Sequence, residues 1–162
     1  MKALLPFLLF SFLYIGCSQE SPSDNPTQDA SQAVLRVSNA TSYIEEQDYH
    51  AALSDMEAAV TLAPQNTEYR FLYCLLKERT GEPRHEAKAC YAEVAANLSN
   101  NPSVPCEKNM NCVIAELMAE SELAERRKHQ FLTLPTAEAE SEMRRHVLEG
   151  FDRKKYLRTI LP

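Results

Sequence analysis

From Ala33 onward, apolar residues recur every three or four positions, and this spacing constrains the fold more than any other feature of the 162-residue chain. Such spacing places apolar side chains on one face of a helix, whereas a half-buried strand would alternate apolar and polar residues. No stretch alternates in that way, and Gly and Pro fall at the edges of the periodic segments. We therefore predict an all-α domain over residues 33–162, a short array of antiparallel helical hairpins with about six to seven helices.

The first 17 residues predict a secretory signal followed by a site of lipid attachment. Lys2 precedes an apolar run, ALLPFLLFSFLYI, which is too short to span a bilayer as a stable helix and has the pattern of a cleaved signal. The run ends at Gly16-Cys17, and the segment LYIGC resembles a bacterial lipobox, with Tyr14 where that motif usually has Leu. The resemblance implies a signal peptide over residues 1–16 and a covalent N-acyl diacylglycerol group on Cys17. The alternative is an ordinary cleaved signal with Cys17 as a spare thiol.

A lipidated Cys17 would anchor the chain to a membrane, because several acyl chains together hold a protein firmly on a bilayer. Ser18 follows the cysteine, and lipoproteins with a non-acidic residue there resemble those exported to the outer membrane. We therefore expect a lipoprotein of the bacterial outer membrane that faces the periplasm. Residues 18–32 contain no large apolar side chain, so residues 17–32 are predicted to be the lipidated cysteine and a flexible tether.

Residues 33–66 resemble a tetratricopeptide repeat, a pair of antiparallel helices that stacks on its neighbours. Pro64 matches the proline that ends such a repeat. Counting back from it places small residues where the two helices must approach closely, at Ala40, Ala52 and Ala59. Gln47 stands where the family has a turn glycine, and Arg36 stands where it prefers a large apolar residue. Residues 67–101 follow at about the expected interval of 34 residues and resemble a degenerate second repeat. The alternative is a generic helical hairpin.

The C-terminal third, residues 112–162, continues the helical pattern without a repeat signature and is predicted to cap the array. We expect one helix over residues 112–132, a second over residues 137–149 with Thr136 as its N-cap, and a short final helix over residues 151–161.

The charge of the chain is acidic overall, at −6, which argues against a nucleic-acid binder. Basic residues nevertheless cluster at 126–128, 144–145 and 153–155. One interpretation is a basic face for anionic lipid headgroups or an acidic partner. The other is a solvated surface with ion pairs between residues four apart, such as Glu122 with Arg126 and Glu140 with Arg144.

Four cysteines remain if Cys17 is lipidated, and an even number in an exported chain favours disulfides. Cys74 and Cys90 each lie eight residues from Glu82, the centre of a Gly-Glu-Pro turn, so helices folded back there would place them opposite each other. We predict that Cys74 pairs with Cys90. The remaining pair, Cys106 with Cys112, would then close a short polar loop without regular structure.

No motif in the chain predicts catalysis. The four histidines are scattered, and GxSxG, HExxH and glycine-rich phosphate loops do not occur. A metal site in which His85 or His50 joins the cysteine thiols is an alternative, although no CxxC or HxxxH pair supports it. We therefore expect a protein that is not an enzyme and has no catalytic residue, metal or cofactor apart from its lipid.

The tetratricopeptide resemblance implies that the first helices of the repeats line a groove that binds a polypeptide. Carried over by position, the groove residues are Thr41, Glu45, Phe71, Leu75, Glu78 and Arg79. The expected function is that of a scaffold, adaptor or pilotin-like assembly factor for an unidentified envelope protein or peptide. One alternative is a regulator or inhibitor of an envelope enzyme that inserts the loop between Cys106 and Cys112 into its target, and another is a helical spacer.

Overall fold

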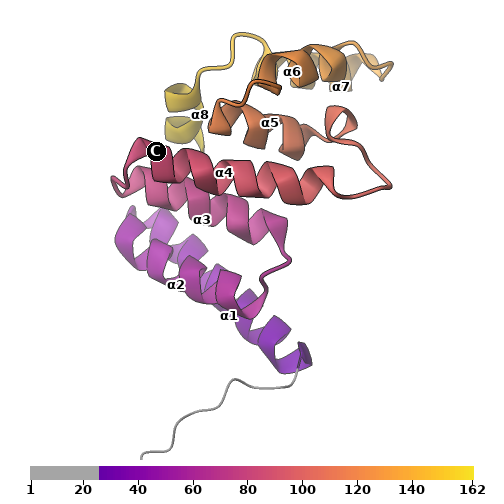
Figure 1. The fold of residues 1–162 in the computed structure, drawn as a ribbon. Helices are drawn as coiled ribbons and strands as arrows, with labels where there is room; N and C mark the ends of the chain where they lie inside the picture. The colour runs from indigo at the N-terminus through magenta and orange to yellow at the C-terminus, as the bar shows by residue number, and fades with distance from the viewer. Residues whose placement is uncertain (1–25) are drawn as a thin grey trace, which may run out of the picture.

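The computed structural model describes residues 26–162, and this range contains eight α-helices, one 3₁₀ helix and no β-strand. The elements in chain order are α1 (Pro26–Glu45), α2 (Tyr49–Leu62), α3 (Thr67–Arg79), α4 (Arg84–Ser99), η1 (Cys106–Lys108), α5 (Met110–Ala119), α6 (Ala124–Leu132), α7 (Glu138–Leu148) and α8 (Arg153–Ile160). Figure 1 shows them stacked from α1 and α2 at one end to α6 and α7 at the other. The predicted all-α hairpin array is confirmed, with more helices than expected.

Helices α1 to α7 pack mainly on their neighbours in the chain, since contacts join α1 to α2, α2 to α3 and so on up to α7. The small residues predicted at the close approaches are fully buried; they are Ala40, Ala52 and Ala59. Absence of a bulky side chain at these points lets two helices pack tightly. Larger buried side chains fill the space between successive hairpins, among them Met56, Leu76, Tyr91 and Met118. One hydrophobic core therefore runs along the stack.

Helix α1 begins at Pro26, seven residues before the predicted start at Ala33. Residues 26–32 of the predicted tether are thus helical, while residues 1–25, including the predicted signal peptide and Cys17, lie outside the described residues. Once a helix is nucleated, each added residue gains one hydrogen bond, so helix can extend beyond the buried face. Proline suits the first helical position, and the carboxylate of Asp29 suits the positive end of the helix. Apolar periodicity therefore marked the packed part of α1 and not its whole length.

Arg36 replaces a large apolar residue of the repeat pattern but still joins α1 to α2. Its guanidinium donates to the Asp55 carboxylate at 2.8 Å, and Asp55 is only 9% exposed. An ion pair with a nearly buried partner can stabilise the helix contact that an apolar side chain would otherwise provide.

The turn between α1 and α2 contains Gln47 in the left-handed conformation, with φ 61°. Its backbone N–H donates to Ile44 O at 3.0 Å, and that of Asp48 donates to Tyr43 O at 2.8 Å, so the turn ends α1 in the way a glycine usually does. Asp48 then caps α2 by accepting from Ala51 N at 3.1 Å.

We expect Gln47→Gly to raise the free energy of unfolding by about 0.5–1 kcal/mol. A side chain with a Cβ makes the left-handed conformation unfavourable by about 1–2 kcal/mol, and this gain exceeds the entropy that glycine adds to the unfolded chain. Urea unfolding measures the difference. Glu46→Gly is the matched control, because Glu46 is exposed and has no positive φ. Equal effects of the two changes would show that the turn conformation carries no strain.

Residues 112–132 do not form the single helix that was predicted. The chain breaks at Glu120, which adopts φ 55° and ends α5, and α6 begins at Ala124. The backbone N–H of Ser121 donates to Glu116 O at 3.1 Å and so closes the end of α5. The Glu120 carboxylate accepts hydrogen bonds from Arg84 and Lys88 of α4, and the Arg84 guanidinium holds the pKa of Glu120 below its usual range. Contacts with a neighbouring helix therefore accompany a break that Gly or Pro does not signal.

Both predicted disulfides are present. Cys74 on α3 bonds to Cys90 on α4 with a Cα–Cα distance of 5.7 Å, and Cys106 bonds to Cys112 with a Cα–Cα distance of 5.3 Å. The loop closed by the second pair was expected to lack regular structure. This expectation was wrong, because η1 and the first turn of α5 occupy it, and Asn109 caps α5 by accepting from Cys112 N.

The predicted cap of the next helix is also wrong. Helix α7 begins at Glu138, and its N-cap residue is Ala137, which makes no side-chain cap. Thr136 instead directs its hydroxyl to the Glu140 carboxylate, so the side chain that could cap the backbone is used one turn further along. Helix α8 forms within the range expected for the final helix, and Asp152 caps it by accepting from Lys155 N at 2.6 Å.

Candidate functional site

Helix α3 packs between α2 and α4, and Arg79 at its end contacts the last residues of the chain. Asn66 starts the helix by accepting hydrogen bonds from Glu68 N and Tyr69 N, each at 3.1 Å. Cys74 and Leu76 are fully buried, and the disulfide of Cys74 with Cys90 holds α3 against α4. Phe71, Leu72 and Leu75 of α3 contribute to an open pocket.

This apolar pocket has a volume of about 320 Å³ and lies between α3, α4, α5 and α8. Its lining residues are Thr67, Glu68, Phe71, Leu72, Leu75, Val94, Leu98, Asn111, Tyr156 and Ile160. The Phe71 ring lies 5.6 Å from the ring of buried Tyr91, which orients it along the pocket wall. Apolar walls with a few polar residues at the edge can receive the apolar side chains of a bound helix.

The C-terminal strap, which we define as residues 153–162, comprises α8 and the last two residues. Its end is held by Arg79, whose guanidinium donates to the backbone oxygens of Leu161 and Pro162, each at 3.1 Å. Tyr49 of α2 also donates its hydroxyl to Pro162 O, and Arg79 lies 4.4 Å above the Tyr49 ring. The strap therefore returns from the far end of the stack to contact α3 and α2, as Figure 1 shows for α8 and the C-terminus.

The start of the strap is held by a nearly buried ion pair. Arg153 bonds to the Glu78 carboxylate at 2.8 Å and donates to Met118 O of α5 at 2.8 Å. The Tyr91 hydroxyl donates to the other Glu78 oxygen at 3.1 Å. Burial, and then the Glu78 charge, raise the pKa of Tyr91 well above its usual range, so its phenol stays protonated and remains a donor. Glu78 thus joins α3, α4 and the strap. On the strap itself, burial alone raises the pKa of the Tyr156 phenol.

The six groove residues expected from sequence fall into three groups. Phe71 and Leu75 line the apolar pocket, and Leu75 is only 2% exposed. Glu78 and Arg79 hold the two ends of the strap, so the chain's own C-terminus uses the polar groups that were expected to bind a partner. Thr41 and Glu45 are exposed on α1, outside the lining of the apolar pocket, and Thr41 donates to Val37 O of its own helix.

Sequence reasoning missed the pocket residues on α4 and on the strap. Val94 and Leu98 come from the second helix of a hairpin, whereas the repeat resemblance implies a groove lined by first helices. Tyr156 and Ile160 belong to a segment whose helical spacing was recognised but whose position in the fold was not. That spacing, with apolar residues also at 157 and 161, was the available signal of an amphipathic helix that needs a surface to cover.

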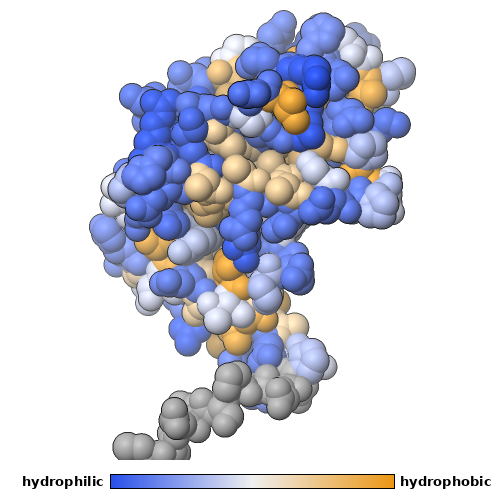
Figure 2. All heavy atoms as spheres, viewed as in Figure 1, coloured by the Kyte–Doolittle hydropathy of each residue, from blue (hydrophilic) through white to orange (hydrophobic). Residues whose placement is uncertain are grey.

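The basic clusters of the C-terminal third do not form one exposed face. Arg127 pairs with Glu116, Arg153 pairs with Glu78, and Arg144 pairs with Glu140 at 2.6 Å as predicted. The predicted pair of Glu122 with Arg126 is not among the ion pairs of residues 26–162. Exposed cations that remain include Lys154 and Lys155 of α8. Figure 2 shows a strongly hydrophilic surface over this end of the molecule.

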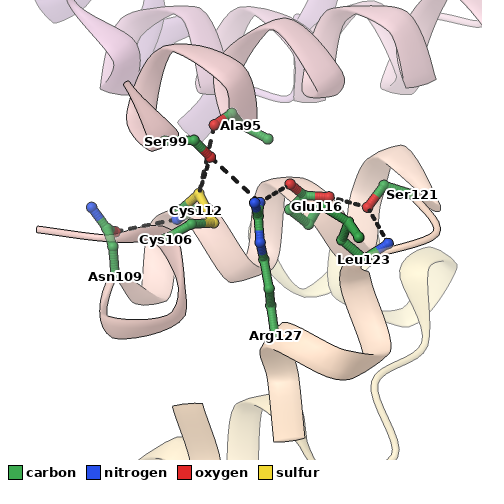
Figure 3. The surroundings of a disulfide bond; sticks show 9 residues. All are labelled: Ala95, Ser99, Cys106, Asn109, Cys112, Glu116, Ser121, Leu123 and Arg127. Atoms are coloured by element: carbon green, nitrogen blue, oxygen red, sulfur yellow. Dashed lines mark hydrogen bonds and ion pairs between the residues drawn. A yellow bond between two sulfur atoms is a disulfide. The ribbon is translucent and has the colours of Figure 1, made fainter. Parts of the chain in front are cut away.

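The loop between Cys106 and Cys112 packs onto the stack. Cys106 is 3% exposed and Cys112 is fully buried, and η1 contacts α4, α5 and α6. In Figure 3 this disulfide lies beside Ser99, whose hydroxyl is 3.5 Å from Cys112 Sγ. The inhibitor alternative would require this loop to enter a target, and in the structure Lys108 and Asn111 are its exposed residues.

In residues 26–162 no group of three or more His, Cys, Asp or Glu side chains is arranged to hold a metal ion. None of the helices in this range combines the length and the hydropathy needed to cross a membrane. No protein-family model, no curated protein and no solved structure matches the chain. We therefore infer function from the geometry around α3 and from the sequence motifs.

Proposed function

We propose that this chain is a membrane-anchored lipoprotein of the bacterial envelope whose tetratricopeptide-like helical domain binds a polypeptide. It acts as a scaffold, adaptor or pilotin-like assembly factor on the periplasmic side of the outer membrane, and it is not an enzyme. The observation that carries the binding proposal is the open apolar pocket beside α3, with Phe71 and Leu75 in its wall. Surface pockets of this composition accept the apolar side chains of a partner.

The cysteines support the proposed location in the periplasm. Two disulfides within 137 described residues suit a chain that folds in an oxidising compartment such as the periplasm. They use all four cysteines that follow Cys17, so no thiol competes with Cys17 for modification. The lipobox resemblance of residues 13–17 supplies the anchor.

Lipid attachment at Cys17 predicts that cells given an alkyne analogue of palmitate will label the wild-type chain and not the Cys17→Ser variant. Serine lacks the thiol that takes the diacylglycerol, and the variant signal is not cleaved before it. Click detection after purification measures the label. Equal labelling of both chains would contradict the anchor, whereas labelling of neither would favour the ordinary cleaved signal.

Polypeptide binding at the apolar pocket predicts a position-specific crosslink in cells. A photoreactive amino acid at Glu68 or Asn111, two exposed residues of the pocket edge, should yield an adduct with another protein. Glu142 on α7 is the matched control, because it is exposed and lies outside the pocket lining. Mass spectrometry of the adducts identifies the partner. The same adducts from all three positions would indicate proximity alone and would contradict a defined site.

A further inference from the structure

The C-terminal strap contacts the stack as an amphipathic helix contacts a groove. Arg153 and the apolar residues three, four, seven and eight positions later lie on the side toward the stack, where Leu157 is 9% and Leu161 is 1% exposed, while Tyr156 and Ile160 face the open pocket. This spacing places all of them along one side of a helix. The opposite side bears Lys155, which is exposed. The surface beside α3 is thus already shaped to hold a short helix that begins with a cation.

The group that binds this cation is the Glu78 carboxylate, and its surroundings select a positively charged side chain. Glu78 has a side chain only 13% exposed, and its partner Arg153 is 11% exposed, so neither group is well solvated. A nearly buried carboxylate strongly favours a cationic partner over a neutral one. The fit of Arg153 is nevertheless incomplete, because its second terminal nitrogen is buried without a hydrogen-bond partner. Arg153 of the strap therefore neutralises the charge of Glu78, but one of its own hydrogen-bond donors stays without an acceptor.

The strap also leaves part of the surface uncovered. Tyr156 and Ile160 form one wall of the apolar pocket, whose volume of about 320 Å³ stays open, and Ile160 is 43% exposed. A helix with larger apolar side chains at these positions could fill space that the strap does not. Such a helix would gain contacts that the strap lacks and could therefore replace it.

We propose that the α3 surface binds an amphipathic helix of a partner protein, with a cation in its first turn and bulky apolar residues three and seven positions later. This helix replaces the C-terminal strap, which acts as a built-in competitor. The proposal rests on the proposed function, since it assigns the class of partner to the same surface. The strap is anchored through polar groups only near its two ends, by Arg153 at the start and by Arg79 and Tyr49 at the last residues, whereas a partner can use the Glu78 carboxylate and the open pocket together.

A labelled peptide of residues 150–162 serves as the probe in a fluorescence-anisotropy measurement on the purified full chain. The wild-type chain should bind it weakly, because the tethered strap competes at an effective concentration on the order of millimolar. The Arg153→Gln chain has a weakened strap and an intact Glu78, so it should bind the peptide at least tenfold more tightly. Adding Glu78→Gln should remove that gain. The control Lys155→Gln, an exposed cation of the same helix, should stay within twofold of wild type.

Hydrogen exchange on the same proteins shows whether a variant has misfolded. Amides of residues 153–162 should exchange faster in the Arg153→Gln chain, while those of α3 and α4 should keep their wild-type protection. Unchanged protection of the strap would overturn the proposal, as would equal peptide affinity in all four chains. Dimers of the Arg153→Gln chain that exchange straps would also overturn it, in favour of a second copy as the occupant. These measurements need no envelope partner, so their failure is distinct from failure of the crosslinks in cells.

Discussion

Replacement of Arg127 by methionine is expected to lower the free energy of unfolding by about 3 kcal/mol, a large share of the stability of a small domain. Arg127 on α6 pairs with the Glu116 carboxylate on α5, and Glu116 is only 7% exposed. Ser121 is the other side chain that donates to this carboxylate (Figure 3). Removal of the guanidinium would leave a nearly buried negative charge with one hydroxyl donor, and an uncompensated buried charge is strongly unfavourable.

The ion pair lies where three helices meet, so its loss should lower the stability of the whole domain. Arg127 also donates to Ser99 Oγ of α4 at 3.4 Å, so one guanidinium links α4, α5 and α6. Equilibrium urea unfolding at neutral pH gives the free energy. The neighbouring Arg126 is exposed, and Arg126→Met should change stability by no more than about 0.5 kcal/mol.

A second variant distinguishes the cost of leaving Glu116 unpaired from the net contribution of the ion pair to stability. Glu116→Leu together with Arg127→Met removes both charges, and most of the lost stability should return, because a buried ion pair and apolar residues of similar volume are often nearly equivalent. A decrease of less than about 1 kcal/mol for Arg127→Met alone would show that water reaches Glu116 and that the pair contributes little.

Loss of the disulfide between α3 and α4 is the second large effect. Cys74→Ala with Cys90→Ala should lower the free energy of unfolding by about 3 kcal/mol, since the crosslink joins residues 16 apart and restricts the unfolded chain. The pair Cys106→Ala with Cys112→Ala opens a ring of only six residues' separation and should cost about 2 kcal/mol.

The comparison of the two double variants tests the reason for the effect. Each is measured without reductant, so that the other disulfide stays intact. A larger loss from the shorter ring would contradict the chain-entropy explanation and would point to the native contacts of Cys112, whose sulfur lies 3.6 Å from Ala95 O.

Turn residues made the hairpin of α3 and α4 predictable. Gly81 has φ 97° and Pro83 precedes the first residue of α4, so the fold-back occurs where the sequence Gly-Glu-Pro predicted it. Equal distances from that turn then placed Cys74 opposite Cys90. The small residues that allow close helix contact were also recognisable, because they occur at fixed distances from Pro64 and all three are fully buried.

Features that depend on distant contacts were not predictable from local pattern. Glu120 adopts the left-handed conformation between α5 and α6, in a segment without Gly or Pro and beside α4 cations. The strap is an ordinary amphipathic segment in sequence, but its place follows from Glu78, which lies 75 residues away from Arg153. For the same reason Glu78 and Arg79 were identified as groove residues without any indication that the chain itself would occupy them.

A crosslink from Glu68 in living cells tests whether the surface beside α3 binds a polypeptide. The photoreactive residue at this position should be compared in wild-type, Arg153→Gln and Lys155→Gln backgrounds. We expect an adduct with a partner protein whose yield rises several-fold when Arg153 is replaced and stays constant when Lys155 is replaced. Absence of any protein adduct at Glu68 in all three backgrounds would contradict it.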